Sequence, residues 1–251
     1  MRLLVVNCNT SSEVTATIVT NARAAAGPGT EIIGIQPAWG PESAEGYFES
    51  FVSAAAVLDA VATYPEPFDA VVMAGFGEHG REGARQLITQ PVVDITEAAA
   101  QVASLVSHRF GVVTTMATAI PGIEESLRNS GLGERCTAVV ATDVPVVSIH
   151  DSGDELVETL SRAAETLLDR GADAIVLGCA GFAGLDQLLE QRLGVPVIDP
   201  VASAVVIAQS LVSLGKKTSK KGAFAPPNDA KRWVGWPVSQ RTALTSNADR
   251  R

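Results

Sequence analysis

The sequence is poor in aromatic and in basic side chains. The first shortage limits the kind of core the chain can form, and the second limits the partners it can bind. Phe, Trp and Tyr make up 5% of the 251 residues, against 46% for all hydrophobic types. Any core must therefore be aliphatic, which suits layered α/β folds. The 19 Lys and Arg residues are outnumbered by 28 Asp and Glu residues, giving a net charge of −9. Such an acidic balance argues against a nucleic acid or an anionic membrane as partner.

Cysteines are few, and no long hydrophobic run is present. Cys8, Cys136 and Cys179 lie too far apart to predict a disulfide framework or a metal cluster. No apolar stretch approaches the roughly 20 residues of a membrane span, and the chain starts without the pattern of a signal peptide. We therefore expect a reduced, soluble, cytoplasmic protein, and nothing indicates a metal or organic cofactor.

Residues 173–181, DAIVLGCAG, join a short β-branched run to a glycine-rich stop. This pattern predicts a buried parallel strand followed by a loop at the carboxyl edge of a sheet, where open α/β folds bind ligands. Cys179 would then lie at the mouth of a crevice, near the start of the next helix, whose dipole favours a thiolate. The alternative is that Cys179 is a small buried packing residue.

The hydrophobic spacing of the first part of the chain alternates between strands and helices. It predicts strands over residues 3–6, 31–35, 69–74 and 91–94, and helices over 13–26, 48–62 and 81–87. Thr10, Ser11 or Ser12 can cap the first helix. The strand–helix alternation indicates parallel sheets.

Part of this pattern occurs a second time. Residues 69–75 (DAVVMAG) match 173–179 (DAIVLGC) at an offset of 104, and 91–94 (PVVD) match 196–199 (PVID) at 105. Residues 2–7 (RLLVVN) match 109–114 (RFGVVT) less closely, at 107. We interpret this as two similar α/β halves, each with a small parallel sheet flanked by helices. The first half comprises 1–95 with about 200–220, and the second comprises 96–199.

Beyond Leu214 the composition changes to a short basic run followed by a polar segment with Trp233 and Trp236. We expect this part to be loose or packed on the surface, with residues 221–251 forming a polar tail.

Two facing halves predict a small cleft where ligand sites tend to lie. The loops that follow the strands would line it: Asn7 to Asn9, Gly75 to Gly77, Thr114 with Thr115, and Cys179 to Gly181. Neither a Walker pattern nor a GxGxxG fingerprint is present.

Several motifs resemble the aspartate/glutamate/hydantoin racemase superfamily, and most closely its hydantoin and allantoin racemases. They are VVNCNT (5–10), GPESAEG (40–46), GFG (75–77), LGCAG (177–181), VPVIDP (195–200) and TSK (218–220). The resemblance implies two pseudo-symmetric α/β domains with the active site between them, often in a homo-oligomer. It also implies cofactor-independent racemisation of a small amino-acid derivative, in which two cysteines transfer protons on opposite faces of the α-carbon.

The resemblance assigns the second-half catalytic cysteine to Cys179, but the first-half position holds Gly75. One alternative is a single-cysteine decarboxylase or isomerase that protonates an enolate-like intermediate. Another is that His79 or Cys8, where relatives usually carry proline, supplies the second proton-transfer group. A third is a catalytically disabled protein that only binds a small molecule.

Neutral hydrogen-bonding groups are the candidates for substrate binding. Glycines let a ligand approach main-chain N–H groups closely, and such groups can stabilise an oxyanion. The expected substrate-binding residues are Asn7, Asn9, Gly75, Phe76, Gly77, Thr114, Thr115, Thr118, Ala180 and Gly181.

Overall fold

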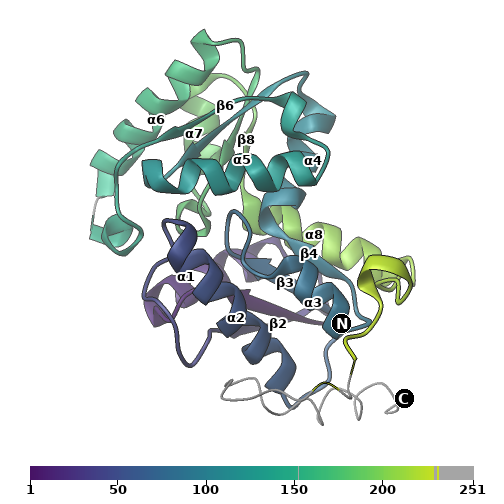
Figure 1. The fold of residues 1–251 in the computed structure, drawn as a ribbon. Coiled ribbons are helices and arrows are strands. Elements are labelled where there is room, and N and C mark those ends of the chain that lie inside the picture. The colour runs from purple at the N-terminus through teal and green to yellow at the C-terminus, as the bar shows by residue number, and fades with distance from the viewer. Residues whose placement is uncertain (152, 229–230, 232–251) are drawn as a thin grey trace.

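In the computed structural model, the strands form two four-stranded parallel sheets, one in each half of the molecule (Figure 1). The structure describes residues 1–151, 153–228 and 231. The first sheet has the order β2-β1-β3-β4 and the second has the matching order β6-β5-β7-β8. Their bounds are β1 Arg2–Asn7, β2 Glu31–Ile35, β3 Ala70–Ala74, β4 Val92–Asp94, β5 Phe110–Thr114, β6 Cys136–Ala141, β7 Ala174–Leu177 and β8 Val197–Ile198. The predicted α/β class with two parallel sheets is confirmed.

Helices cover both faces of each sheet. Their bounds are α1 Ser12–Ala25, α2 Tyr47–Thr63, α3 Arg81–Leu87, α4 Ile95–Val106, α5 Ile120–Asn129, α6 Gly153–Asp169, α7 Asp186–Leu193 and α8 Pro200–Ser213. In the first half, α1 and α8 pack on one face of the sheet and α2 and α3 on the other. In the second half, α6 and α7 oppose α5 and most of α4.

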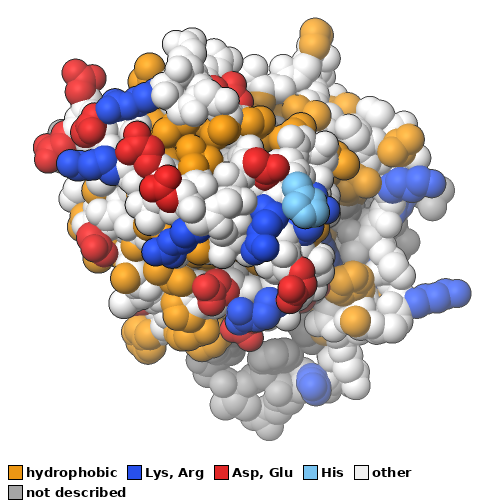
Figure 2. Space-filling model, turned by 90° about the horizontal axis from the view of Figure 1, so that it is seen from above, with side chains coloured by type: hydrophobic (Ala, Val, Ile, Leu, Met, Phe, Trp, Pro, Cys, Tyr) orange, Lys and Arg blue, Asp and Glu red, His pale blue; other side chains and the backbone are white. Residues whose placement is uncertain are grey.

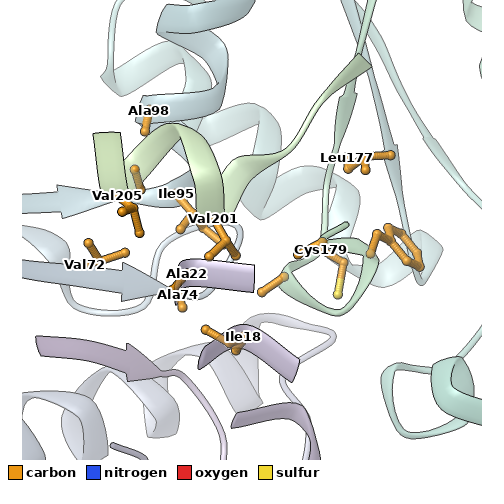
Figure 3. Packing of buried hydrophobic residues seen from close by; sticks show 14 of the residues in the cluster. Ile18, Ala22, Val72, Ala74, Ile95, Ala98, Leu177, Cys179, Val201 and Val205 are labelled. Atoms are coloured by element: carbon orange, nitrogen blue, oxygen red, sulfur yellow. The ribbon is translucent and has the colours of Figure 1, made fainter. Parts of the chain in front are cut away.

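Alternate residues of each strand enter different cores, because a strand directs successive side chains to opposite faces. Leu3 and Val5 of β1 belong to a core cluster that spans both halves, whereas Leu4 and Val6 belong to a second cluster under α2 and α3. The shared cluster contains side chains from both sheets and from α1 and α8. Figure 3 shows Cys179 among the residues of this cluster, together with Ile18 and Ala22 of α1. The two halves are therefore joined by apolar packing.

The repeat in the sequence corresponds to repeated hydrogen bonds. The carboxylate of Asp69 accepts from the main-chain N–H of Arg2 at 2.7 Å, and that of Asp173 accepts from the N–H of Arg109 at 2.7 Å. Each aspartate thus fixes the start of the strand that lies beside its own. Likewise, Asp94 caps α4 and Asp199 caps α8.

Local predictions hold closely at the helix starts. Ser11 is the residue that caps α1, because its hydroxyl accepts from the N–H of Val14 at 3.3 Å. The helices predicted at 48–62 and 81–87 occur as α2 and α3. Among the described residues, no helix is both long and apolar enough to cross a membrane. Figure 2 shows acidic and basic side chains interspersed on the face above the second sheet.

Beyond Leu214, residues 218–224 pack on the surface of the first half. The Thr218 hydroxyl donates to the carbonyl of Gln90, and the Lys220 ammonium donates to the carbonyl of Arg85 at 2.5 Å. The guanidinium of Arg85 lies 5.9 Å from the ring centre of Phe224, a cation–π distance. Residues 218–224 therefore pack against the C-terminal end of α3 and hydrogen-bond one of its last carbonyl groups. Trp233 and Trp236 lie outside the described residues.

The cap of α8 gives a test of stability. Asp199 accepts from the N–H of Ala202 at 2.9 Å and from that of Gly184 at 2.7 Å, so its side chain fixes both a helix start and a loop. We expect Asp199→Ala to lower the free energy of unfolding by about 2 kcal/mol and Tm by several degrees.

Asp169→Ala, at the exposed end of α6, serves as the control and should shift stability by less than about 0.5 kcal/mol. Equal melting temperatures for the two variants in calorimetry would contradict this account of the cap.

Candidate active site

The carboxyl ends of β1, β3, β5 and β7 meet at a narrow pocket of about 30 Å³ between the two halves. Parallel strands bring the loops that follow them to one edge of a sheet, and the two sheets present these edges to each other. The pocket is lined by Asn7, Cys8, Asn9, Val14, Ala44, Ala74, Gly75, Phe76, His79, Thr114, Thr115, Ala119, Val146, Gly178, Cys179, Ala180 and Gly181. Most of the predicted site residues thus come together in one place.

Cys179 forms the wall of the pocket contributed by the second half. It directly follows Gly178 at the end of β7 and is 9% exposed. Its Sγ accepts a hydrogen bond from the main-chain N–H of Gly181 at 3.3 Å. An N–H donor favours a thiolate, but burial outweighs it and raises the pKa of Cys179 to about 11.

This result corrects the expectation of a thiolate favoured by a helix dipole. The segment after Cys179 is a 3₁₀ helix of three residues, Ala180–Phe182, and the next α-helix, α7, begins only at Asp186. A single 3₁₀ turn aligns few peptide dipoles, so little remains to offset desolvation. In the free protein the thiol of Cys179 is protonated at neutral pH.

Cys8 and His79 form the wall contributed by the first half. Cys8 follows β1 and is 9% exposed; burial, reinforced by the nearby Cys179, raises its pKa to about 12. His79 is 5% exposed, and burial lowers its pKa to about 4 despite a hydrogen bond to the main chain of Phe76. Its Nδ1 is buried and has no partner among the described residues. Both sequence candidates for a second proton-transfer group therefore reach the pocket.

The two asparagines of the loop after β1 have different roles: Asn7 holds the loop in shape, and Asn9 has a hydrogen-bond donor left for a ligand. The amide nitrogen of Asn7 donates to Asn9 Oδ1 at 2.9 Å and to Thr15 Oγ1 at 3.0 Å, so Asn7 shapes the loop. Asn9 Oδ1 also accepts from the N–H of Ser11, whereas its amide nitrogen has no protein partner within the described part of the chain. Asn9 is therefore the one of the pair with a donor to offer a ligand.

The threonines of the second half divide in the same way. Thr114 donates its hydroxyl to the carbonyl of Gly178 at 3.1 Å and so ties β5 to the loop of Cys179. Thr115 is 3% exposed and lines the pocket. Thr118 does not line this pocket but an adjoining larger cavity, and its hydroxyl donates to the carbonyl of Glu45, which anchors the loop before α2.

Gly77 likewise lines the larger cavity and not the narrow pocket. Its N–H donates to the Thr96 hydroxyl at 2.8 Å, and its carbonyl accepts from the Ser126 hydroxyl at 3.1 Å. Since α4 and α5 occupy both of its main-chain groups, Gly77 cannot serve as an oxyanion donor. It holds the loop of Phe76 and His79 in place, and the buried Arg81, which donates to Ser126, supports the same contact.

A larger cavity of about 200 Å³ adjoins the narrow pocket, and four residues line both: Ala44, Phe76, His79 and Ala119. The starts of α2 and α5 supply most of its remaining wall, including Tyr47, Phe51, Gly122, Ile123 and Glu125. The rings of Tyr47 and Phe51 stack with centroids 6.0 Å apart. No lysine or arginine occurs among the described residues that line these two cavities.

The lining also includes residues that the sequence analysis did not single out. Ala44, Ala119 and Val146 are apolar and carry no chemical signature, so their spacing gave no signal. Ala44 belongs to the GPESAEG motif, which could have indicated it. The neighbouring Glu45 accepts from the N–H of Val146 at 2.7 Å and thereby connects the two halves beside the pocket.

Comparison with known proteins places this geometry among racemases. The family described as Asp/Glu/Hydantoin racemase matches residues 3–208. The structure of an allantoin racemase from Pseudomonas fluorescens is 49% identical, with a TM-score of 0.91 over 94% of this chain and 100% of that one. A hydantoin racemase from Paenarthrobacter aurescens is 36% identical over 232 residues, which is 91% of this chain and 98% of its own length.

An arylmalonate decarboxylase is much less similar. Its unliganded structure is 18% identical, with a TM-score of 0.58 over 84% of this chain and 92% of that one. Likeness at this level shows a common fold alone.

The raised pKa of Cys179 predicts the pH dependence of its alkylation. Only the thiolate reacts with iodoacetamide. In the folded protein, alkylation of Cys179 should be slow at pH 7 and should rise about tenfold per pH unit to roughly pH 10, because the thiolate fraction rises in that way below the pKa. Mass spectrometry of the Cys179 peptide measures the rate.

The same peptide in guanidinium-unfolded protein is the control, since its thiol has an ordinary pKa. A folded-state rate that is already independent of pH near 7 would show that the thiolate is stabilised and would contradict the dominance of burial.

Proposed function

Because the chain belongs to the Asp/Glu/hydantoin racemase family, we propose that it interconverts the mirror-image forms of a hydantoin- or allantoin-like compound, using only its own side chains for proton transfer. The observation that carries the proposal is the pocket between the halves, where Cys179 on one wall is opposed by Cys8 and His79 on the other. Racemisation needs an acid and a base on opposite faces of a planar carbanion.

The charge of the cavities supports a neutral ring rather than a free amino acid. An α-carboxylate is held most strongly by a cation, and the described lining of both cavities holds neither lysine nor arginine. The amide of Asn9 and the hydroxyl of Thr115 offer neutral hydrogen bonds of the kind that suit a ring of alternating N–H and C=O groups. The substrate is therefore a cyclic amide.

Proton loss from the α-carbon puts negative charge on the adjacent carbonyl oxygen. The main-chain N–H groups of the loops at Phe76 and Ala180 flank the pocket and are the candidates to stabilise this oxyanion. A buried site strengthens such hydrogen bonds because little water competes for them. The same burial that raises the thiol pKa values makes each thiolate a stronger base, which suits a weakly acidic C–H bond.

The two cavities would hold different parts of the substrate. A volume of about 30 Å³ holds the reacting carbon and its neighbours but not a larger compound, so the substituent on that carbon extends past Phe76 and Ala119 into the cavity of about 200 Å³. Aromatic rings and Ile123 favour an apolar stem there, and Glu125 disfavours an anionic end. Hydantoins with long neutral or cationic substituents should fit best.

The function is tested by α-proton exchange in D₂O, followed by NMR, over a panel of hydantoins, allantoin, amino acids and arylmalonates. We expect exchange with racemisation for a member of the hydantoin or allantoin group, and a loss of racemisation of about 10²–10⁴-fold in Cys179→Ala.

Deuterium that enters only as CO₂ leaves would overturn the proposal in favour of a decarboxylase. Tight binding with no exchange for any member would overturn it in favour of a binding protein. Cys136→Ala, which removes a thiol outside the pocket, is the control and should leave the rate unchanged.

The substituent cavity is tested by filling it. Gly122 lies in α5, where an added Cβ would approach only Tyr47, at 3.8 Å, so a larger side chain can enter the cavity without backbone strain. We expect Gly122→Phe to lower kcat/KM for 5-benzylhydantoin by about tenfold or more while changing that for 5-methylhydantoin little.

Glu124→Ala, on the same helix but outside both cavities, should affect neither substrate. An equal loss for both hydantoins would show that Gly122→Phe disturbs the reacting centre rather than a substituent site.

A further inference from the structure

Position 75 has no room for a side chain. A Cβ built on Gly75 would lie 2.4 Å from His79 Cδ2, 2.6 Å from Cys8 Cβ and 3.0 Å from Cys8 Sγ. Carbon atoms in contact are normally 3.5–4.0 Å apart. The space that a residue at position 75 would occupy is therefore already filled by the thiol of Cys8 and the ring of His79.

Positions 8 and 75 are neighbours across the first sheet. Asn7 at the end of β1 pairs with Ala74 at the end of β3, so Cys8 and Gly75 each follow one of two paired residues. Adjacent strands are about 4.8 Å apart, so a thiol at position 8 can reach nearly the same space as one at position 75. Both positions face the loop of Cys179 across the pocket.

From this geometry we propose that Cys8 is the second proton-transfer residue, and that its thiol occupies the place of a side chain at position 75, which has to be glycine for that reason. The inference rests on the proposed racemase function and adds the identity of the group opposite Cys179. It also makes the site depart from the symmetry of the fold. Gly75 corresponds to Cys179 at the offset of 104, whereas Cys8 corresponds to Thr115 at 107.

Chemical matching favours Cys8 over His79. In a racemisation each group is the base in one direction and the acid in the other, so the two groups work best with similar proton affinities. Burial raises the pKa of Cys8 to about 12 and that of Cys179 to about 11, while it lowers the pKa of His79 to about 4. His79 is a positioning residue: its ring packs beside Gly75 and bonds the main chain of Phe76.

The step balances without a co-reactant. One thiol first releases its proton to solvent, and the resulting thiolate is the base. It takes the α-proton and becomes a thiol, and the electron pair of the C–H bond moves onto the adjacent carbonyl as an enolate. The thiol of the other cysteine then donates its proton to the opposite face, a C–H bond forms with the returning electron pair, and that cysteine is left as the thiolate. The reverse reaction exchanges the two roles.

Separate enantiomers provide the test. Each is incubated in D₂O with the wild-type protein, with Cys8→Ala and Cys8→Ser, and with Cys179→Ala. We expect both Cys8 variants to lose racemisation by about 10²–10⁴-fold yet to retain α-proton exchange on one enantiomer, by way of Cys179. Cys179→Ala should retain exchange on the opposite enantiomer only. Cys8→Ser keeps the volume of the site and guards against a folding defect.

His79→Ala distinguishes the competing assignment. A positioning role predicts reduced but equal rates on both enantiomers, whereas an acid/base role predicts that the one-sided exchange occurs in His79→Ala and not in the Cys8 variants. Racemisation at wild-type rates in both Cys8 variants would overturn the inference while leaving the racemase function intact. Absence of exchange in the wild-type protein would overturn the function itself.

Placing the thiol at position 75 instead of position 8 tests the claim that the two side chains require the same space. Gly75→Cys alone should lose activity, because its Cβ collides with Cys8 and His79. Cys8→Gly with Gly75→Cys removes the collision with Cys8, and adding His79→Ala removes the remaining one. We expect racemisation to recover at least tenfold from Cys8→Gly in this triple variant. Full activity in Gly75→Cys alone, or no recovery in a triple variant that melts like the wild type, would contradict it.

Discussion

Side chains from both sheets pack into a single apolar core, with α1 and α8 between them. Because α8 follows the last strand of the second sheet and then packs on β3 and β4 of the first, neither half can move without disturbing that core. Close-packed interiors resist such displacement. This constraint holds the carboxyl ends of the two sheets face to face, and the narrow pocket exists only because those ends meet.

Within that frame, the repeated hydrogen bonds of Asp69 with Arg2 and Asp173 with Arg109 preserve the symmetry of the two halves. The symmetry ends at the pocket. The second half presents a cysteine after β7, whereas the first half presents glycine after β3 and a cysteine after β1. The close contact at Gly75 links these two differences, since a side chain at position 75 and the thiol of Cys8 require the same space. A change at one position thus constrains the other.

Much of this architecture could be predicted from the sequence. Short β-branched runs that stop at glycines identify β3 and β7, and the fixed offset between them indicates two similar halves. Cys179 was singled out because it lies in the loop just after such a run, separated from the strand end at Leu177 only by Gly178. By contrast, the contact between Cys8 and Gly75 depends on the pairing of β1 with β3, which spans 67 residues of chain and has no local signature.

The site details that were missed depend on distant partners. The N–H of Gly77 was expected to face a ligand, but Thr96, 19 residues later, takes it. The Thr118 hydroxyl bonds Glu45, 73 residues away, so Thr118 lines the larger cavity instead of the narrow pocket. The helix dipole expected at Cys179 does not form because a 3₁₀ turn occurs there. Apolar lining residues such as Ala119 carry no signal until the fold brings them together.

The most direct measurement of the two-thiol account is the position of the label at low conversion. One pure enantiomer of the best hydantoin substrate is incubated with the wild-type protein in D₂O. The recovered substrate and the product are separated by chiral chromatography, and the deuterium content of each is measured by mass spectrometry. With separate thiols on the two faces, the product carries deuterium and the recovered substrate remains unlabelled. Deuterium in the recovered substrate at the rate of racemisation would mean that a single group serves both faces, and would contradict the account.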